Sequence, residues 1–198
     1  MFIPLPAKTS NVIAITTIPT KTKVPSYLLP DIKKFANYFS VKIASLTIIV
    51  FPSSGHINIT GITSFTQIPD TSQLLNDVFQ TKTKPKLNIV SSTSTGKIVH
   101  TRQLRYRNHP TIWQNIAKIA SQKYTISFQR GVFPSVIIRN ISRLNPKWSG
   151  CIQIFNTGKY NIIGCKSKKA IKNAIASLTY LLSLFYNNYL NTVHLRNK

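Results

Sequence analysis

Apolar and polar residues alternate in two blocks of the chain, and each block holds a pair of glycines at the same spacing. Gly61 follows Gly55 by six residues in the first block, and Gly164 follows Gly158 by six residues in the second. Alternation with a period of two predicts β-strands. A glycine between two such runs predicts a tight hairpin turn, because glycine adopts positive φ without steric cost. The sequence therefore predicts two similar β-hairpins.

The strand after each hairpin glycine has two chemically different sets of side chains. Successive side chains of a strand point to opposite faces of the sheet, so the two sets separate in space. We expect the apolar set to face a helix and the mixed set to face outward. The apolar set is Ile57, Ile59, Tyr160 and Ile162, and the mixed set is His56, Asn58, Thr60, Lys159, Asn161 and Ile163.

Helical periodicity follows each hairpin block. An apolar stripe with helical spacing predicts a helix from Ala170 to Phe185. Pro69 and Asp70 are typical of a helix start and predict a shorter helix in the first half of the chain. We also expect helices over residues 27–38 and 111–122.

The order of these elements occurs twice, which indicates an internal repeat. Asn11 begins the run Asn-Val-Ile, and Asn88 begins Asn-Ile-Val 77 residues later. Each run precedes a hairpin block and a helix. The expected organisation is a first repeat over residues 1–80, a linker over 81–86, a second repeat over 87–186 and a polar tail over 187–198.

The charge of the chain indicates a polyanionic partner. Its 198 residues include 26 Lys and Arg but only 3 acidic residues, so the formal net charge is +23. Nucleic acid is the first expectation for such a partner, and an anionic membrane surface is the second. No apolar run reaches the roughly 18 residues of a membrane span, and no signal peptide precedes the first strand, so we expect an intracellular protein.

The same composition argues against catalysis and against metal binding. Three scattered carboxylates do not supply a multi-carboxylate metal site or a glycosidase pair with its supporting groups. Two cysteines are too few for a disulfide framework or a cysteine-rich zinc site. No nucleophile, base and orienting acid can be combined from the pattern. We expect no enzyme activity, no metal and no cofactor.

Three motifs in the second half resemble the TATA-box-binding protein family. They are Phe-Pro-Ser-Val-Ile-Ile-Arg over residues 133–139, Ile-Phe-Asn-Thr-Gly-Lys over 154–159 and Gly-Cys-Lys over 164–166. The runs that begin at Asn11 and Asn88 resemble the first strands of the family's two repeats. The resemblance covers about residues 8–185. It implies an α+β fold, a saddle in which two pseudo-symmetric repeats form one curved antiparallel sheet with helices on the convex face.

This resemblance implies a transcription initiation factor that binds the minor groove of A·T-rich promoter DNA. Phenylalanines would wedge between base steps and bend the duplex, while central asparagines would donate to the acceptors that A·T and T·A pairs share. The wedges would be Phe39, Phe51, Phe133 and Phe155, with Pro134 beside them. The remaining contacts would come from Asn11 and Asn88, from Ile13 and Val90 on the groove floor, and from Asn58, Thr60, Lys159 and Asn161.

The implied partners are A·T-rich double-stranded DNA, a TFIIB-like factor and an RNA polymerase, with the protein acting as a monomer on DNA. Its place would be the nucleus, or a cytoplasmic replication site if the protein is viral. One departure concerns the second end loop, residues 140–150, which is basic where the family carries acidic residues that receive the TFIIB-type partner.

Charge alone leaves a second hypothesis open. A non-specific architectural protein that binds any DNA or RNA would need the same positive surface but no base preference. A substrate-binding domain of a larger enzyme is a third hypothesis, but the two repeats fill the chain and leave no catalytic domain.

Overall fold

The computed structural model describes residues 2–19, 32–100, 125–127, 135–139, 150–155 and 157–196. The expected wedge Phe133, its neighbour Pro134 and the expected helix over residues 111–122 lie outside these ranges. The chain forms two compact units. We call Thr9–Ser92 the N-terminal unit, and Met1–Lys8 together with Thr93–Lys198 the C-terminal unit.

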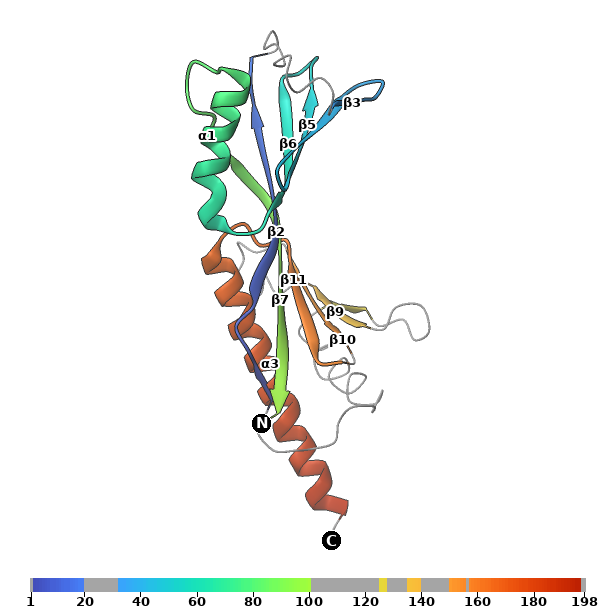
Figure 1. Cartoon of the computed structure of the whole chain (residues 1–198). Coiled ribbons are helices and arrows are strands. Elements are labelled where there is room, and N and C mark those ends of the chain that lie inside the picture. Colours follow the sequence, from blue (N-terminus) through green and yellow to red (C-terminus); the bar gives the residue numbers. More distant parts are fainter. Residues whose placement is uncertain are drawn as a thin grey trace. The chain divides into compact units, whose positions relative to one another are not determined.

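The N-terminal unit is an antiparallel sheet backed by one helix (Figure 1). Its strands lie in the order β3-β4-β5-β6-β2. A 3-10 turn, η2, precedes helix α1. The elements are β2 (Lys8–Thr17), β3 (Ile32–Lys34), β4 (Phe39–Ile43), β5 (Leu46–Phe51), β6 (His56–Ile62), η2 (Phe65–Gln67) and α1 (Ile68–Phe79).

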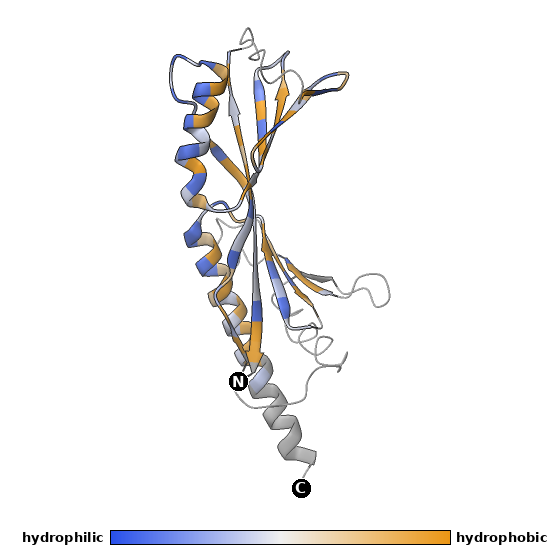
Figure 2. Cartoon of the chain, in the orientation of Figure 1, coloured by the Kyte–Doolittle hydropathy of each residue, from blue (hydrophilic) through white to orange (hydrophobic). Residues whose placement is uncertain are grey.

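Alternation along these strands separates a buried face from an accessible one, as the sequence predicts. Ile57 and Ile59 are fully buried, whereas Asn58 and Thr60 between and after them are not. In Figure 2, α1 carries apolar residues on one side and polar residues on the other. One core joins helix and sheet, and its buried members are Val12, Ala14, Ile18, Val41, Leu46, Ile48, Val50, Ile57, Ile59, Ile62, Leu75, Val78 and Phe79.

Local sequence signals account for the start of α1. Ser64 and Gln67 form a capping box at the preceding turn. The Ser64 hydroxyl accepts the backbone N–H of Thr66 at 3.2 Å, and the Gln67 side-chain oxygen accepts the backbone N–H of Ser64 at 3.1 Å. Pro69 occupies the first helical turn, where its missing N–H has no intrahelical partner to lose. Asp70 lies in the same turn and complements the positive end of the helix dipole.

A bulge near the end of β6 depends on Gly61. The register between β2 and β6 shifts between Val12 and Ala14. Gly61 has φ +90°, and a Cβ at this position would lie 2.2 Å from the carbonyl oxygen of Ser45. Glycine is therefore required here both by backbone conformation and by space.

The C-terminal unit has the same arrangement of an antiparallel sheet and a helix, but its strands and its helix differ in length from those of the N-terminal unit. Its strands lie in the order β7-β11-β10-β9-β8, and β1 pairs with β7 as well. Helix α3 packs against β1 and runs along the unit in Figure 1. The elements are β1 (Phe2–Pro4), β7 (Asn88–His100), β8 (Thr125–Ser127), β9 (Ser135–Arg139), β10 (Cys151–Phe155), β11 (Lys159–Ile163) and α3 (Lys168–Arg196).

The two hairpin turns have matching hydrogen bonds. The N–H of Gly55 donates to the carbonyl of Phe51 at 2.9 Å, and that of Gly158 donates to Phe155 at the same distance. Each glycine carbonyl in turn accepts an isoleucine N–H at 2.8 Å, from Ile18 and from Ile98 respectively. Phe51 and Phe155 are therefore equivalent positions.

A buried tyrosine of the C-terminal unit forms a hydrogen bond with the segment that follows β1. Tyr160 is fully buried, and its hydroxyl donates to the carbonyl oxygen of Leu5. Gly96 lies opposite Tyr160 across the strands, and a Cβ there would lie 2.4 Å from the tyrosine ring. Burial raises the pKa of the Tyr160 phenol to about 12. The neutral phenol is therefore the form that this site stabilises.

Two expectations differ from the structure. Residues 32–34 form β3 rather than part of a helix, because Ile32 pairs with the buried Val41 of β4. Helix α3 continues to Arg196, through most of the expected polar tail. The expected repeat boundaries stay a prediction; in the two compact units, residues 1–8 group with the second half and 81–92 with the first.

Candidate nucleic-acid interface

The sheet of the N-terminal unit has an open face, which is the face opposite α1. Cross-strand register brings nine side chains to this face from three neighbouring strands. None of them is buried, and most are apolar or hydroxyl-bearing. They are Ile13, Ile15 and Thr17 of β2, His56, Asn58 and Thr60 of β6, and Thr47, Ile49 and Phe51 of β5.

Asn11 lies next to this face and has a fixed amide orientation. Its Oδ1 accepts the backbone N–H of Gly61 at 3.3 Å. The oxygen of the amide is therefore directed toward the sheet, and the Nδ2 hydrogens remain to donate to another molecule.

A row of aromatic rings lies at the end of the open face where the hairpin turns. Phe35 stacks on Tyr38 with ring centroids 4.4 Å apart, and Tyr38 lies 5.6 Å from Phe51. His56 lies 6.4 Å from Phe51 on the other side. Phe35 is 50% exposed, so this row presents an apolar ring to solvent. A hollow of about 430 Å³ adjoins the row, lined by residues 34–39 and 52–53.

The assignment of Phe39 to the interface needs correction. Phe39 pairs with Val50 and packs against the hydrophobic core, so its ring lies on the helix side of the sheet. The sequence contains a signal for this placement, since Phe39, Val41 and Ile43 alternate as one apolar stripe. The rings that sequence reasoning misses are the exposed Phe35 and the half-buried Tyr38. They flank a turn in which the Phe35 N–H donates to the Tyr38 carbonyl at 2.9 Å.

The open face of the C-terminal unit is more polar. It is the face opposite the buried Tyr160 and Ile162, and the hydroxyl of Thr95 donates to Oδ1 of Asn161 at 3.0 Å within it. Phe155, half-buried, ends β10 beside the hairpin. The open-face members are Thr93, Thr95 and Lys97 of β7, Lys159, Asn161 and Ile163 of β11, and Cys151, Gln153 and Phe155 of β10.

The first residues of β7 expose the second asparagine of the repeat. Asn88 and Val90 are both exposed, and Val90 retains 39% of its surface. Ile89 between them packs against the core of the N-terminal unit. The alternation directs Asn88 and Val90 away from that core.

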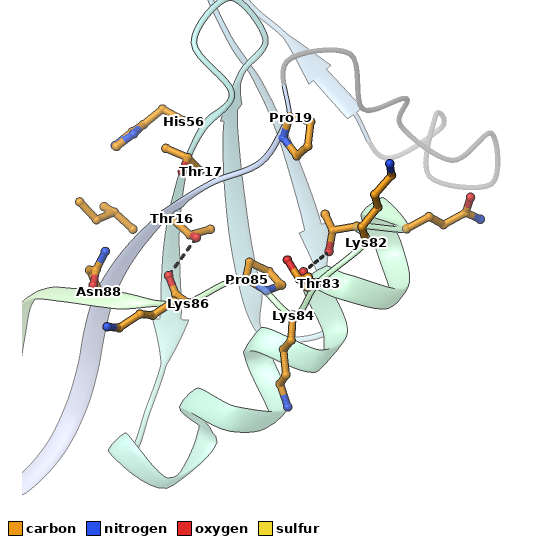
Figure 3. Close-up of a pocket in the computed structure, with 13 residues that line it drawn as sticks. Thr16, Thr17, Pro19, His56, Lys82, Thr83, Lys84, Pro85, Lys86 and Asn88 are labelled. Carbon is orange, nitrogen blue, oxygen red and sulfur yellow. Dashed lines mark hydrogen bonds between the residues drawn. The ribbon is translucent and has the colours of Figure 1, made fainter.

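The linker forms a basic hollow beside the N-terminal open face (Figure 3). Its volume is about 720 Å³. The linker backbone is held by two side chains, because the Thr16 hydroxyl donates to the Lys86 carbonyl at 3.0 Å and the Ser72 hydroxyl donates to the Pro85 carbonyl. The hollow is lined by the strand residues Ile15, Thr16, Thr17, His56 and Asn88, by Pro19 after β2, by Gln80 at the end of α1, and by Thr81, Lys82, Thr83, Lys84, Pro85 and Lys86 of the linker.

Cys151 of β10 is a half-buried free cysteine. Burial raises the pKa of the Cys151 thiol, while Arg139 nearby acts in the opposite direction, so the net effect keeps the thiol protonated. In the described ranges, no group of three or more His, Cys, Asp or Glu is placed to hold a metal ion. No helix in this part of the chain is long and apolar enough to cross a membrane.

Comparison with known proteins identifies the family. The family model described as "Transcription factor TFIID (or TATA-binding protein, TBP)" matches residues 87–185. Among solved structures, the TBP of Methanococcus jannaschii matches with a TM-score of 0.61 and 19% identity, over 92% of this chain and 99% of that one. No curated protein sequence matches. The structural match confirms the expected α+β fold of this family. Because the family model spans half of the chain, the chain belongs to the TATA-binding protein family of transcription factors.

Proposed function

We propose that this protein starts transcription by binding the minor groove of A·T-rich promoter DNA with the open faces of both units. The observation that carries the proposal is the state of the amides on those faces. Asn11 and Asn161 each have their oxygen occupied by a donor from the protein itself. Each therefore presents amide hydrogens, and the minor-groove edges of A·T and T·A pairs present only acceptors.

Aromatic rings at the ends of the open faces supply the bending step. Insertion of an apolar ring between base steps unstacks them and bends the duplex away from the protein, which increases the contact surface. In the N-terminal unit this role falls to the row containing Phe35 and Phe51 rather than to Phe39. In the C-terminal unit it falls to Phe155, and Phe133 with Pro134 remains the proposed companion.

Between the rings, small aliphatic side chains fit the groove floor. Ile13 and Val90 lie on accessible faces of their strands, beside the two asparagines that precede them by two positions. Apolar contact there excludes water from the groove and favours A·T steps, because the guanine amino group would remain without a partner. Thr60 and Asn58 of β6 extend the same surface.

The positive charge provides affinity without sequence preference. With a net charge of +23, the protein releases counterions wherever its lysines approach phosphates. The linker lysines adjoin open-face residues in one hollow, so they are the proposed phosphate contacts nearest to Asn88. Recruitment of a TFIIB-like factor and an RNA polymerase by the bound protein completes the proposed role.

Fluorescence resonance energy transfer between dyes at the two ends of a short duplex tests this function. We expect a bent state with an A·T-rich duplex and a much weaker signal with a G·C duplex of equal length. Asn88→Asp should abolish the bent state, because a carboxylate cannot donate to the base acceptors and is repelled by phosphates. Asn173→Asp makes the same charge change on α3 and serves as the control.

Equal affinity for every duplex, with no bending, would support the non-specific architectural hypothesis instead. The same conclusion would follow if Asn88→Asp lowered affinity no more than Asn173→Asp does, since both variants lower the net charge by one unit.

A further inference from the structure

Two amides occupy equivalent positions in the two units but have different neighbours. Asn58 and Asn161 each lie three residues after the hairpin glycine, on the open face. The cross-strand neighbour of Asn161 on β7 is Thr95. The cross-strand neighbour of Asn58 on β2 is Ile15. The repeat therefore places a hydroxyl beside one amide and a hydrocarbon beside the other.

This difference fixes one amide and leaves the other able to turn. Thr95 donates to Oδ1 of Asn161 at 3.0 Å, so the oxygen is directed toward β7 and the Nδ2 hydrogens face outward. Gln153 flanks Asn161 on its other side. Asn58 lies between Ile15 and Ile49, and no hydrogen bond to its amide occurs within the described residues. Rotation about its last side-chain torsion can present either nitrogen or oxygen.

The two amides should consequently read base edges differently. An outward NH₂ group matches the acceptors N3 of adenine and O2 of thymine, but it opposes the amino group that guanine adds to the minor groove. A freely turning amide can direct its oxygen to that guanine amino group and accept from it. The fixed amide excludes G·C pairs, and the turning amide tolerates them.

We infer that Thr95 is a positioning residue which makes the half-site under the C-terminal unit intolerant of G·C, while the half-site under the N-terminal unit, read by Asn58, tolerates it. This inference rests on the proposed binding of the minor groove. Its consequence is an orientation: a protein with two similar units binds an asymmetric site in one direction only, and the Thr95–Asn161 hydrogen bond supplies the asymmetry.

Reciprocal substitutions test this directly. Thr95→Val removes the hydroxyl with almost no change of shape at an exposed position. Ile15→Thr places a hydroxyl at the equivalent position beside Asn58. Thr179→Val is the matched control, because it makes the same chemical change on α3, outside the open faces, where the hydroxyl only donates to the Ile175 carbonyl of its own helix. Thermal melts of all three confirm folding before binding is measured.

The measurement is selection of bound sequences from a random duplex pool, followed by alignment of the selected sites. The wild-type protein should select an A·T-rich site that admits G·C in one half only. Thr95→Val should raise the G·C frequency in the stringent half about fivefold or more, since one good polar contact discriminates by roughly that much. Ile15→Thr should lower it in the tolerant half, and Thr179→Val should match the wild type.

Pools from Thr95→Val and Ile15→Thr that match the wild-type pool would overturn the inference, and so would a wild-type site with equal tolerance in both halves. In these cases selection of an A·T-rich site still supports the proposed function. A wild-type pool without any A·T preference would overturn both proposals. A change in overall affinity without a change in half-site preference would also overturn the inference, because Thr95 would then affect the strength of DNA binding but not the choice of base pair.

Discussion

The open faces of the two units are built from equivalent strands but carry chemically different side chains. The N-terminal unit presents Ile13, Ile15 and Ile49 with a row of aromatic rings at its end. The C-terminal unit presents mainly hydroxyls, amides and lysines, among them Thr95 and Asn161. Apolar contact supplies desolvation, whereas polar contact supplies direction and base discrimination. A duplicated fold can thus divide two parts of one task between its halves.

The two units also differ in what surrounds a closely packed glycine. A Cβ on Gly61 would meet a backbone oxygen at 2.2 Å, whereas a Cβ on Gly96 would meet the ring of Tyr160 at 2.4 Å. We expect Gly61→Ala to lower the free energy of unfolding by about 3 kcal/mol, because the backbone cannot move away and φ is positive. Gly96→Ala should cost about 1–2 kcal/mol, since a side chain can shift. Urea denaturation measures both, and a larger loss for Gly96→Ala would contradict this order.

Two phenylalanines of the N-terminal unit provide a comparison between core and interface. Phe39→Ala should lower the free energy of unfolding by about 2 kcal/mol, because the ring packs against the core. Phe51→Ala should leave stability within about 1 kcal/mol of the wild type but reduce duplex affinity roughly tenfold, because the variant has no ring to stack on a base. Chemical denaturation and binding titrations separate the two effects. If Phe51→Ala unfolds the protein and Phe39→Ala does not, the faces have been assigned the wrong way round.

Two groups of three lysines allow a test of the proposed phosphate contacts. Alanine at Lys82, Lys84 and Lys86 should reduce the salt dependence of DNA binding by about 0.9 in the log–log slope for each phosphate that the variant no longer neutralises. The same change at Lys168, Lys169 and Lys172 of α3 should leave the slope close to that of the wild type. Affinity measured over a series of salt concentrations gives both slopes. Equal slopes for the two triple variants would indicate that only net charge matters.

The smallest expected effect concerns Tyr160 and alkaline pH. The folded-state pKa of about 12 lies above the ordinary value of about 10, so the folded state holds the proton more tightly than the unfolded state. The resulting stability is fully present below pH ~10 and is lost as the pH rises toward ~12. Tyr160→Phe should cost about 1 kcal/mol at neutral pH, because the hydrogen bond to Leu5 is absent. The difference in unfolding free energy between wild type and variant should shrink with rising pH, and a constant difference would contradict the linkage.

Much of this architecture can be predicted because it is local. The alternation around Ile57 and Tyr160 identifies the buried faces, and Pro69 with Asp70 identifies the start of α1. The hairpin glycines identify the repeat, and both have positive φ as expected, 67° at Gly55 and 78° at Gly158. Each of these signals depends on a few neighbouring residues, which a sequence displays directly.

Sequence reasoning fails where distant residues decide. Residues 32–34 have no strong strand pattern of their own, and pairing with β4 makes them a strand. The prediction for Phe39 fails for another reason: the family resemblance suggests it as a partner of Phe51, although the local alternation with Val41 places its ring on the core face. The hydroxyl of Thr95 reaches Asn161 across 66 residues of sequence, a separation at which no local pattern indicates contact.

The attachment of β1 to the C-terminal unit sets an order of events during synthesis on the ribosome. The carbonyl of Leu5 cannot accept its hydrogen bond until Tyr160 has been synthesised, 155 residues later. At about 5–20 residues per second, this wait is on the order of 10–30 seconds. The N-terminal unit can fold during this time, because its residues are contiguous in the sequence. Residues 2–5 are consequently synthesised before the N-terminal unit but reach their final partner after it.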